Sequence, residues 1–530
     1  MLGEKAHRQI YTVLLALLGI TMVSSVFAAN LVWVLLGVNW LAEGRWHDKW
    51  RRAKESRLLW AVGLFYGLLL VGMLWTSDTA NGLRILEAKL PLLVLPLVIL
   101  TTPPLAERPR RAVAAIYSVA VIVVSIIAII RLNTIPDLPY RQAVPHLSHI
   151  RFSLNCCIVL YLLVGQIHRP TTPLAARLAL LLSVGWLLAV LLSLHSLTAL
   201  SILAIVSLAI PLYRRRWAFA LVWLTTMTAT ATIVGIEVKR YYRPSPLAQQ
   251  PLPTFTAAGH PYIHLQDGLI ENGNYINNHL CPEELASEWN KRSVLPYDGT
   301  AQNGYTIAAT LIRYLNASGL TKDSVGVANL TDAEIRAVEQ GVANPVYRQP
   351  NPIRRIVYTT LFEREHYRHT HATAGFSNLQ RLALWEATAD IIAHHPLAGV
   401  GTGDVVQAIQ EVLTLRGSDL AGTPMRSHNQ YLGTAAAVGL PAALLVLLLV
   451  LWAAYRAWSR RHSATSRATA FALAYALTIA ISMLTEDTLD TLMGILVSLF
   501  PLVLLPPRGK EEPTPAAAAD GAKGSEAPCR

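Results

Sequence analysis

The residues best suited to chemistry lie in the run Arg426-Ser427-His428-Asn429-Gln430-Tyr431-Leu432, where a long apolar segment begins. Histidine titrates nearest to neutral pH, so the imidazole of His428 could accept a proton from a hydroxyl group. Polar groups at a membrane boundary are costly and are commonly retained for a function. The sequence makes His428 a candidate general base, but His428 and Asn429 could equally be polar residues that open a membrane helix.

Three cationic residues stand near other helix ends. Arg151 precedes an apolar segment and lies on the expected outer side of the membrane, where the loops are otherwise poor in positive charge. Its planar guanidinium would match phosphate oxygens. Lys89 could snorkel to water or contact a phosphate. Arg381 lies in the first turn of an expected helix and could be a solvated surface residue or part of the same anion site.

Two further motifs could suggest ligands. The run Gly399-Val400-Gly401-Thr402-Gly403-Asp404 has alternate glycines, which could let backbone amides approach an anion or could simply make a tight turn after a helix. The run from Glu365 to His371 has spacings that suit no zinc motif well. Asp487 and Asp490 are interpreted as a solvated loop. We therefore predict no metal site and no cofactor.

The composition is that of a polytopic membrane protein, because 53% of the 530 residues are hydrophobic and only 15% are charged. Most apolar segments approach the roughly 20 residues that a membrane helix needs. The second is short, so the first two could be a tilted or re-entrant pair. The twelve expected segments are 10–28, 30–42, 58–75, 84–101, 112–131, 152–167, 178–193, 197–213, 217–237, 429–454, 468–485 and 489–506.

Lysine and arginine placement predicts the orientation of these helices. Alternate short loops are rich in arginine, as in Arg214-Arg215-Arg216, which favours a cytoplasmic position for those loops and for both termini. The long segment 238–427 then lies outside. It holds 16 Lys and Arg against 17 Asp and Glu, a net charge of −1, so the overall charge of +12 is a topology signal and does not indicate nucleic-acid binding.

We therefore expect an all-α membrane protein with about twelve transmembrane helices and one large, mainly helical outer loop. The expected divisions are helices one to nine in 1–237, the loop domain in 238–427, helices ten to twelve in 428–507 and a disordered tail in 508–530. Within the loop, helical patterns cover 304–315, 331–339, 353–368 and 377–395, the second and fourth opened by capping boxes.

Taken together, these features resemble the O-antigen ligase and polymerase superfamily. The resemblance is strong over 381–441 and moderate over 84–155. The residues that carry it are Arg381, Trp385, His395-Pro396-Leu397-Ala398-Gly399-Val400-Gly401-Thr402-Gly403, Ser427-His428-Asn429-Gln430-Tyr431-Leu432, Gly439-Leu440-Pro441, Ser148-His149-Ile150-Arg151 and Lys89-Leu90-Pro91. Members often carry a Ser-Arg pair at the start of a mid-chain membrane helix, where this chain reads Leu194-His195-Ser196, so no role of that arginine carries over.

The resemblance implies a C-type glycosyltransferase-like fold in the bacterial inner membrane, with its active site on the periplasmic side. The implied reaction is that of an O-antigen ligase, in which a glycan passes from undecaprenyl diphosphate to a sugar hydroxyl of lipid A–core, with inversion and without a metal. His428 would act as the base, with Arg151, Arg381, Lys89 and Asn429 binding substrate. Both substrates and the surrounding membrane lipids are the implied partners.

Two groups of alternatives remain at this point. An O-antigen polymerase or a protein oligosaccharyltransferase of the same superfamily would share the donor chemistry and differ only in the acceptor. A lipid or polysaccharide transporter is the alternative from another class. A transporter with two homologous halves would show an internal repeat, and none is visible in the sequence.

Overall fold

The apolar segments form helices in the computed structural model, which describes residues 3–135, 138, 140–265, 268–373, 375–459 and 466–506. The predicted disordered tail 508–530 lies outside the described residues. Two compact units are present, Met1–Ala220 with Arg381–Arg530, and Leu221–Gln380. The second unit is therefore shorter than the expected loop domain 238–427, because the stretch from Arg381 onward belongs with the membrane helices.

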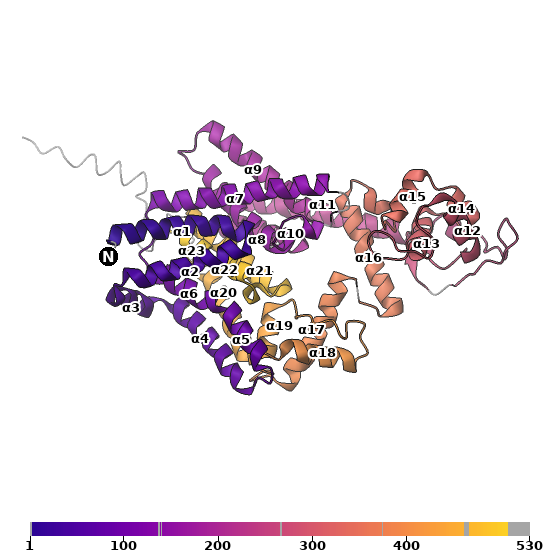
Figure 1. The fold of residues 1–530 in the computed structure, drawn as a ribbon. Helices are drawn as coiled ribbons and strands as arrows, with labels where there is room; N and C mark the ends of the chain where they lie inside the picture. Colours follow the sequence, from indigo (N-terminus) through magenta and orange to yellow (C-terminus); the bar gives the residue numbers. More distant parts are fainter. Residues whose placement is uncertain are drawn as a thin grey trace, which may run out of the picture. The chain divides into compact units, whose positions relative to one another are not determined.

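The first unit contains helices at nearly all the predicted membrane positions (Figure 1). These are α1 (Glu4–Ser24), α2 (Val26–Glu43), α3 (Trp46–Glu55), α4 (Arg57–Val71), α5 (Thr79–Ala88), α6 (Leu90–Thr101), α7 (Glu107–Thr134), α8 (His149–Ile167), α9 (Leu174–Ser193), α10 (Leu197–Tyr213), α19 (Gln430–Val438), α20 (Leu440–Ser459), α21 (Ser466–Thr485), α22 (Leu492–Leu499) and α23 (Pro501–Leu504). A further long helix, α11 (Trp217–Tyr242), begins in this unit and continues into the second.

Nine helices in the described part of the chain are long and apolar enough to cross a membrane, which confirms an all-α polytopic membrane protein. Four predicted spans are shorter or broken. The segment 84–101 is divided between α5 and α6, 429–454 is divided between α19 and α20, α10 has 17 residues, and 489–506 becomes α22 and α23.

The expectation of a short second membrane segment is wrong. The helix α2 has 18 residues and begins directly after Ser25, whose extended backbone ends α1. The hydroxyl of Ser25 accepts a hydrogen bond from the Ala28 amide at 3.2 Å and so caps α2. The two helices pack along each other, as Figure 1 shows.

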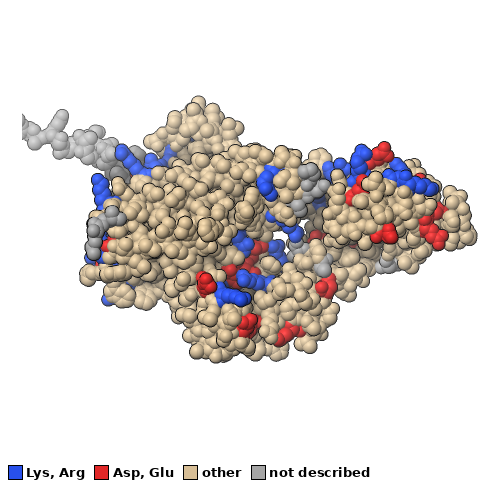
Figure 2. Space-filling view, viewed as in Figure 1, with Lys and Arg blue, Asp and Glu red and all other residues tan. Residues whose placement is uncertain are grey.

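The helix α8 lies at the centre of the membrane unit. It packs against α7, α9, α10 and α21, and every residue from Phe152 to Leu160 is buried. A polar group in an apolar environment needs a partner, and the Tyr117 hydroxyl on α7 donates to Asn155 Oδ1 on α8 at 2.7 Å. The uncharged flank of the membrane helices is the broad tan surface of Figure 2.

The second unit is a small helical domain with one two-stranded hairpin. Its elements are η3 (Leu247–Gln249), β1 (Ile270–Glu271), β2 (Asn274–Tyr275), α12 (Pro282–Arg292), α13 (Ile307–Ser318), α14 (Ser324–Ala328), α15 (Asp332–Glu339), η4 (Pro345–Arg348) and α16 (Pro352–Thr370). The side chain of Trp289 is fully buried in its core. The capping box predicted at Thr331 forms, with Thr331 and Glu334 each accepting from the other's backbone amide, whereas the side chain of Ser377, in the second predicted box, lies outside the described residues.

Two helices of the first unit lie between this domain and α19 in sequence. They are α17 (Ser377–His394), whose first residues count with the domain, and α18 (Val405–Leu415). Leu384 and Ile391 of α17 share a buried apolar cluster with Ile409 of α18 and Ala436 of α19. The position of Arg381 is therefore coupled by packing to the helix that follows His428.

The glycine-rich run after α17 holds helices together, and the alternative of an anion-binding loop is wrong. The amides of Val400 and Gly401 donate to the carbonyl oxygens of Ala436 and Ala437 at 2.8 and 3.0 Å, and the amide of Gly403 donates to the Thr76 hydroxyl at 3.3 Å. A side chain on Gly401 would collide with Thr76 at 2.7 Å. These amides are satisfied within the protein, so they are not available to an anion.

Candidate functional site

A short acidic turn separates two apolar helices at one end of the membrane unit. It contains Glu486, Asp487 and Asp490, and it joins α21 to α22 through the single turn η5 (Thr488–Asp490). Glu486 and Asp487 are only 7% and 6% exposed. Carboxylates removed from water need cations or hydrogen-bond donors nearby, so the surroundings of this turn define the site.

Lys89 provides the first countercharge. It stands at the break between α5 and α6, where Pro91 in the first turn of α6 fits the start of a new helix. The lysine is 4% exposed, and its ammonium forms an ion pair with Asp490. Gln430 also donates to Asp490 Oδ1, at 3.1 Å, while its own carbonyl oxygen accepts from the Leu489 amide at 2.6 Å.

His428 is held beside Asp487 by the backbone. Its φ of 51° is left-handed, a conformation that is uncommon for residues other than glycine. The His428 amide donates to Asp487 Oδ2 at 3.2 Å, and the Ser427 hydroxyl donates to Oδ1 at 3.3 Å. The imidazole Nδ1 lies 3.9 Å from Asp487 Oδ2, close enough for electrostatic attraction and too far for a hydrogen bond.

Asn429 fixes the start of the helix that follows. Its side-chain oxygen accepts from the amides of Tyr431 and Leu432 at 3.0 and 3.1 Å, which is the geometry of an N-cap. Asn429 therefore opens the helix as a polar capping residue, which is one of the two roles considered for it from the sequence. A contact between Asn429 and substrate stays a prediction.

Three arginines approach His428. Arg381, Arg151 and Arg426 are close enough that their charges lower the pKa of His428, after burial, which has the larger effect in the same direction. The negative charge of Glu486 raises the pKa of His428. Glu486 also accepts a hydrogen bond from Arg381 Nη2 at 2.8 Å. Arg151 and Arg381 therefore lie near enough to His428 for their charges to act on it, and their assignment to substrate binding stays a prediction.

Arg151 differs from Arg381 in having no carboxylate beside it among the ion pairs of the described residues. Its Nε is buried and has no hydrogen-bond partner among the described residues. An unpaired buried donor is costly, and such groups are uncommon unless a ligand or water completes them. The guanidinium at the start of α8 is therefore suited to an anionic ligand.

The pKa of Asp487 is raised well above the ordinary carboxyl value, first by burial and then by the charge of Asp490. A proton gained by His428 would add a positive charge close to this carboxylate and would stabilise its ionised form. Asp487 thus suits the role of a partner that stabilises an imidazolium, as the carboxylate does in other acid–base pairs.

The interpretation of Asp487 and Asp490 as a solvated loop is wrong, because both belong to the buried centre of the site. A sequence signal was available. Three acids stand within five positions between two apolar helices, and carboxylates at membrane depth are usually paired and functional. The expectation that a lone terminal lysine would snorkel is likewise wrong for Lys89, since its countercharge comes from a distant part of the chain.

The stretch Leu194-His195-Ser196 lies near the start of α8. The ring of Tyr140, in the turn η2 (Tyr140–Gln142), lies 5.0 Å from the ring of His195 and 5.5 Å from that of His149. His195 has a left-handed φ of 48°. The rings of Tyr140, His149 and His195 thus pack together near the start of α8.

Among the described residues, no group of three or more His, Cys, Asp or Glu side chains is placed to hold a metal ion. In the candidate run beginning at Glu365, that carboxylate accepts from the Tyr242 hydroxyl at 2.6 Å, and the ring of His366 packs against those of Phe362 and Phe376.

Removal of Lys89 tests whether the buried turn depends on its countercharge. Lys89→Ala should reduce the free energy of unfolding by up to about 3 kcal/mol, less than the cost for a fully buried pair because the Asp490 side chain is 24% exposed. The double variant Lys89→Ala/Asp490→Ala should be more stable than Lys89→Ala alone. Thermal unfolding in detergent measures both, with the exposed Lys54→Ala as control; strictly additive losses would contradict the pairing.

A comparison with known protein families matches a stretch of the chain that contains candidate site residues. A family model described as O-antigen ligase matches residues 342–447, which include Arg381 and the His428 turn. No curated protein matches the chain.

Proposed function

We propose that this chain is an O-antigen ligase, on the premise that residues 342–447 are similar to the family model described as O-antigen ligase. It would transfer a glycan from undecaprenyl diphosphate to a sugar hydroxyl of lipid A–core. The observation that carries the proposal is the convergence of Arg151, Arg381 and Arg426 on His428, beside a buried carboxylate turn. A base surrounded by arginines suits a reaction in which a hydroxyl loses a proton and a diphosphate departs.

The proposed step is a single displacement. The acceptor oxygen bonds to the anomeric carbon while the bond from that carbon to the diphosphate oxygen breaks, and its electron pair leaves with the diphosphate. The hydroxyl proton passes to the imidazole of His428, and the configuration at the anomeric carbon inverts. Asp487 stabilises the imidazolium that forms.

Arg151 and Arg381 are assigned to the leaving diphosphate. Arg151 has a buried Nε without a partner among the described residues, and Arg381 pairs with Glu486 at the edge of the site. Guanidinium groups match phosphate oxygens with two parallel donors, and their effect grows in a site partly removed from water. Lys89 is assigned to positioning, because its ammonium is buried against Asp490.

The proposed location is the inner membrane of a bacterium, with the site on the periplasmic side. Support comes from the distribution of arginine, since the loops at the opposite ends of the same helices carry the basic clusters. Both substrates are lipids, so they would reach the site from the outer leaflet.

Transfer in vitro tests the proposal directly. Purified protein in nanodiscs is given undecaprenyl diphosphate-linked glycan and lipid A–core, and the product is measured by gel mobility with and without EDTA. The glycan should appear on lipid A–core, and EDTA should leave the rate unchanged. Elongation of the lipid-linked glycan without transfer to lipid A–core would indicate a polymerase and would overturn the ligase assignment.

His428→Ala should reduce the rate of transfer by about 10²–10⁴-fold, because it removes the proton acceptor. The variant should still bind undecaprenyl diphosphate. His394→Ala, on the exposed side of α17, is the matched control and should keep its rate.

Because burial and the neighbouring arginines lower the pKa of His428, the imidazole stays neutral to a lower pH than usual. The rate should therefore hold as the pH falls to 6.5 and should decline only below it. A decline centred above pH 6.5 would contradict this assignment.

Arg151→Ala and Arg381→Ala should each weaken the binding of undecaprenyl diphosphate by about tenfold or more, since each loses a charge-assisted contact with phosphate. Arg416→Ala is the control, because Arg416 also pairs with carboxylates, on α17, without facing His428. Dissociation constants from lipid titration in detergent give the comparison. If the two site variants and the control variant bound undecaprenyl diphosphate with equal affinity, the assignment of the diphosphate to this site would be wrong.

A further inference from the structure

Four tryptophans surround the short helix α3. They are Trp40 near the end of α2, Trp46 and Trp50 of α3, and Trp60 in the first turn of α4. The ring centroids of Trp40 and Trp46 lie 5.3 Å apart and those of Trp50 and Trp60 lie 6.3 Å apart, each pair edge to face. The proposed function leaves these side chains without a role.

The helix α3 lies at the far end of the membrane unit from the acidic turn. The helix α6 begins directly after Lys89 and ends at Thr101, whose hydroxyl accepts from the Trp40 indole at 2.8 Å. Its 12 residues span roughly 18 Å at about 1.5 Å per residue. Arg45, directly before α3, pairs with Glu4, so α3 lies at the end of the unit where α1 begins (Figure 1). The surface of α3 is therefore separate from the candidate active site.

The chain spans the membrane on both sides of α3. The helix α2 and the segment Arg57–Trp75 are each long and apolar enough to cross a bilayer. Gly44 and Arg45 both have a left-handed φ, of 68° and 53°, and reverse the chain between α2 and α3. Because only residues 44–56 join the two spans, α3 lies at the bilayer surface.

A buried lysine fixes the rotation of α3 about its own axis. Lys49 is 4% exposed, and its ammonium pairs with Glu43 at 3.0 Å and lies 4.6 Å from the centroid of the Trp40 ring. Such a ring favours a cation that has left water. Ala53, one turn later, is also buried, and α3 packs against α4 and α6. The side of α3 with Lys49 and Ala53 therefore faces the protein.

The tryptophans beside this buried stripe are exposed. Trp46 and Trp50, one turn apart, are each 55% exposed, and Trp60 is 54% exposed. Among the described residues, their indole N–H groups have no hydrogen-bond acceptor. An exposed indole is unfavourable in water, whereas tryptophan is enriched at the membrane–water boundary, where its ring is covered and its N–H stays solvated. We call these three side chains the tryptophan flank.

Cationic side chains border the tryptophan flank. Segment 45–57 holds six Lys and Arg against two Asp and Glu, a net charge of +4. The ammonium of Lys54 lies 5.3 Å from the centroid of the Trp50 ring, and Arg57 begins α4 one turn before Trp60. Neither Lys54 nor Arg57 forms an ion pair with a described carboxylate. Tryptophans with adjoining cations are typical of a helix that lies on an anionic membrane surface.

A topology signal accounts for the charge of this segment and not for its aromatic side chains. The bias toward lysine and arginine on one side of a membrane requires no tryptophan there. A helix that faced only water would gain nothing from three half-exposed indole rings.

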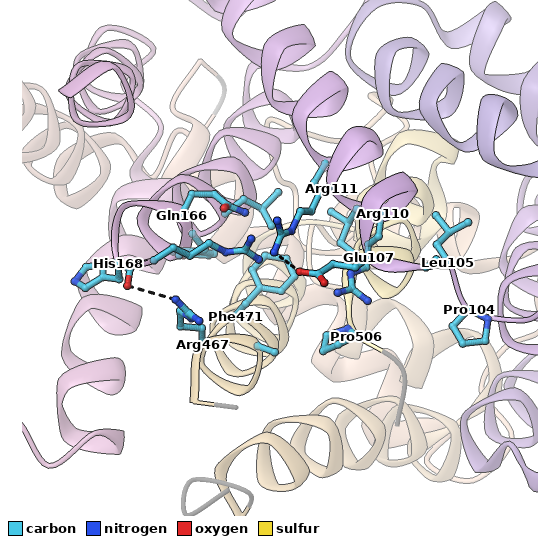
Figure 3. A pocket seen from close by; sticks show the side chains of 18 of the residues that line it. Pro104, Leu105, Glu107, Arg110, Arg111, Gln166, His168, Arg467, Phe471 and Pro506 are labelled. Carbon is cyan, nitrogen blue, oxygen red and sulfur yellow. Dashed lines mark hydrogen bonds and ion pairs between the residues drawn. The ribbon is translucent and has the colours of Figure 1, made fainter. Parts of the chain in front are cut away.

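The tryptophan flank is also distinct from the cavity at this end of the membrane unit. That cavity has a volume of about 930 Å³ and lies where α7 and α21 begin and α8 ends (Figure 3). No residue of α3 lines it. Figure 3 shows one pair of its wall, Arg111 with Glu107. The inference therefore concerns the outer surface of α3 alone.

We propose that α3 lies in the headgroup layer of the bilayer and binds anionic phospholipid. Trp46, Trp50 and Trp60 enter the layer where the acyl chains begin, and Lys54 and Arg57 contact the phosphate groups. The inference does not depend on the enzyme activity proposed above. It requires only that α2 and α4 cross the membrane and that Lys49 fixes the rotation of α3.

The test measures, position by position, how far lipid covers α3. Full-length protein with Cys529→Ser is the parent, because Cys156, Cys157 and Cys281 are buried. Trp50→Cys and Glu55→Cys are made in this parent and placed in nanodiscs of phosphatidylglycerol and phosphatidylcholine. The rate of reaction with a membrane-impermeant maleimide is divided by the rate for the same variant unfolded in detergent.

Trp50→Cys should react at least about tenfold more slowly than Glu55→Cys, because lipid covers the tryptophan flank. Glu55 is exposed and lies about 140° from Trp50 around the same helix, which makes it a matched control. Trp46→Cys keeps the Trp50–Trp60 pair and should be protected to the same degree, which guards against local disruption by the first variant. Equal rates at Trp50 and Glu55 would leave this flank open to water or to a protein partner and would overturn the proposal.

The lipid composition tests the requirement for anionic headgroups. Protection of Trp50→Cys should be at least about threefold stronger in the mixed nanodiscs than in phosphatidylcholine alone, since phosphatidylcholine carries no net charge. Adding Lys54→Gln with Arg57→Gln should remove this difference. The control pair Arg108→Gln with Arg215→Gln removes the same charge from exposed residues of α7 and of the turn after α10, and it should preserve the difference. Equal protection in both lipids, or equal losses in the two double variants, would contradict the proposal.

Discussion

The arrangement of the side chains around His428 depends on the pairing of carboxylates that are largely buried. Glu486 and Asp487 are buried and Asp490 is partly buried where α21 gives way to α22, and removing charge from water is costly without a partner. Each carboxylate takes its partner from a different part of the chain. Lys89 comes from the break between α5 and α6, Arg381 from α17, and His428 from the turn before α19. The acidic turn thus holds three distant segments around one centre.

The glycine-rich run and the asparagine cap support this centre. The amides of Val400 and Gly401 bind the last carbonyl oxygens of α19, and the side chain of Asn429 binds the first amides of the same helix. Both ends of α19 are therefore fixed. This matters for His428, because its left-handed backbone is held by flanking hydrogen bonds and sets the direction of the imidazole.

Sequence reasoning found the membrane helices and the cationic side of the site. Hydrophobic length predicts a membrane helix directly, and charge at a helix end identified Arg151, Arg381 and His428 as candidates. It failed where the partner of a residue is remote in sequence. Nothing near Lys89 in the sequence indicates that Asp490 neutralises it, although three acids within five positions between two apolar helices did indicate that this turn needs partners. The capping role of Asn429 can be predicted from the neighbouring residues in the sequence, whereas the burial of Asp487 depends on tertiary packing.

The central claim is that a lipid diphosphate binds between Arg151 and Arg381 with its glycosyl bond facing His428. A cryo-electron microscopy structure of the protein in nanodiscs with undecaprenyl diphosphate tests it most directly. The account predicts phosphate density in contact with both guanidinium groups and beside the imidazole. Diphosphate density that contacts neither arginine, or that lies at the opposite end of α8, would contradict it.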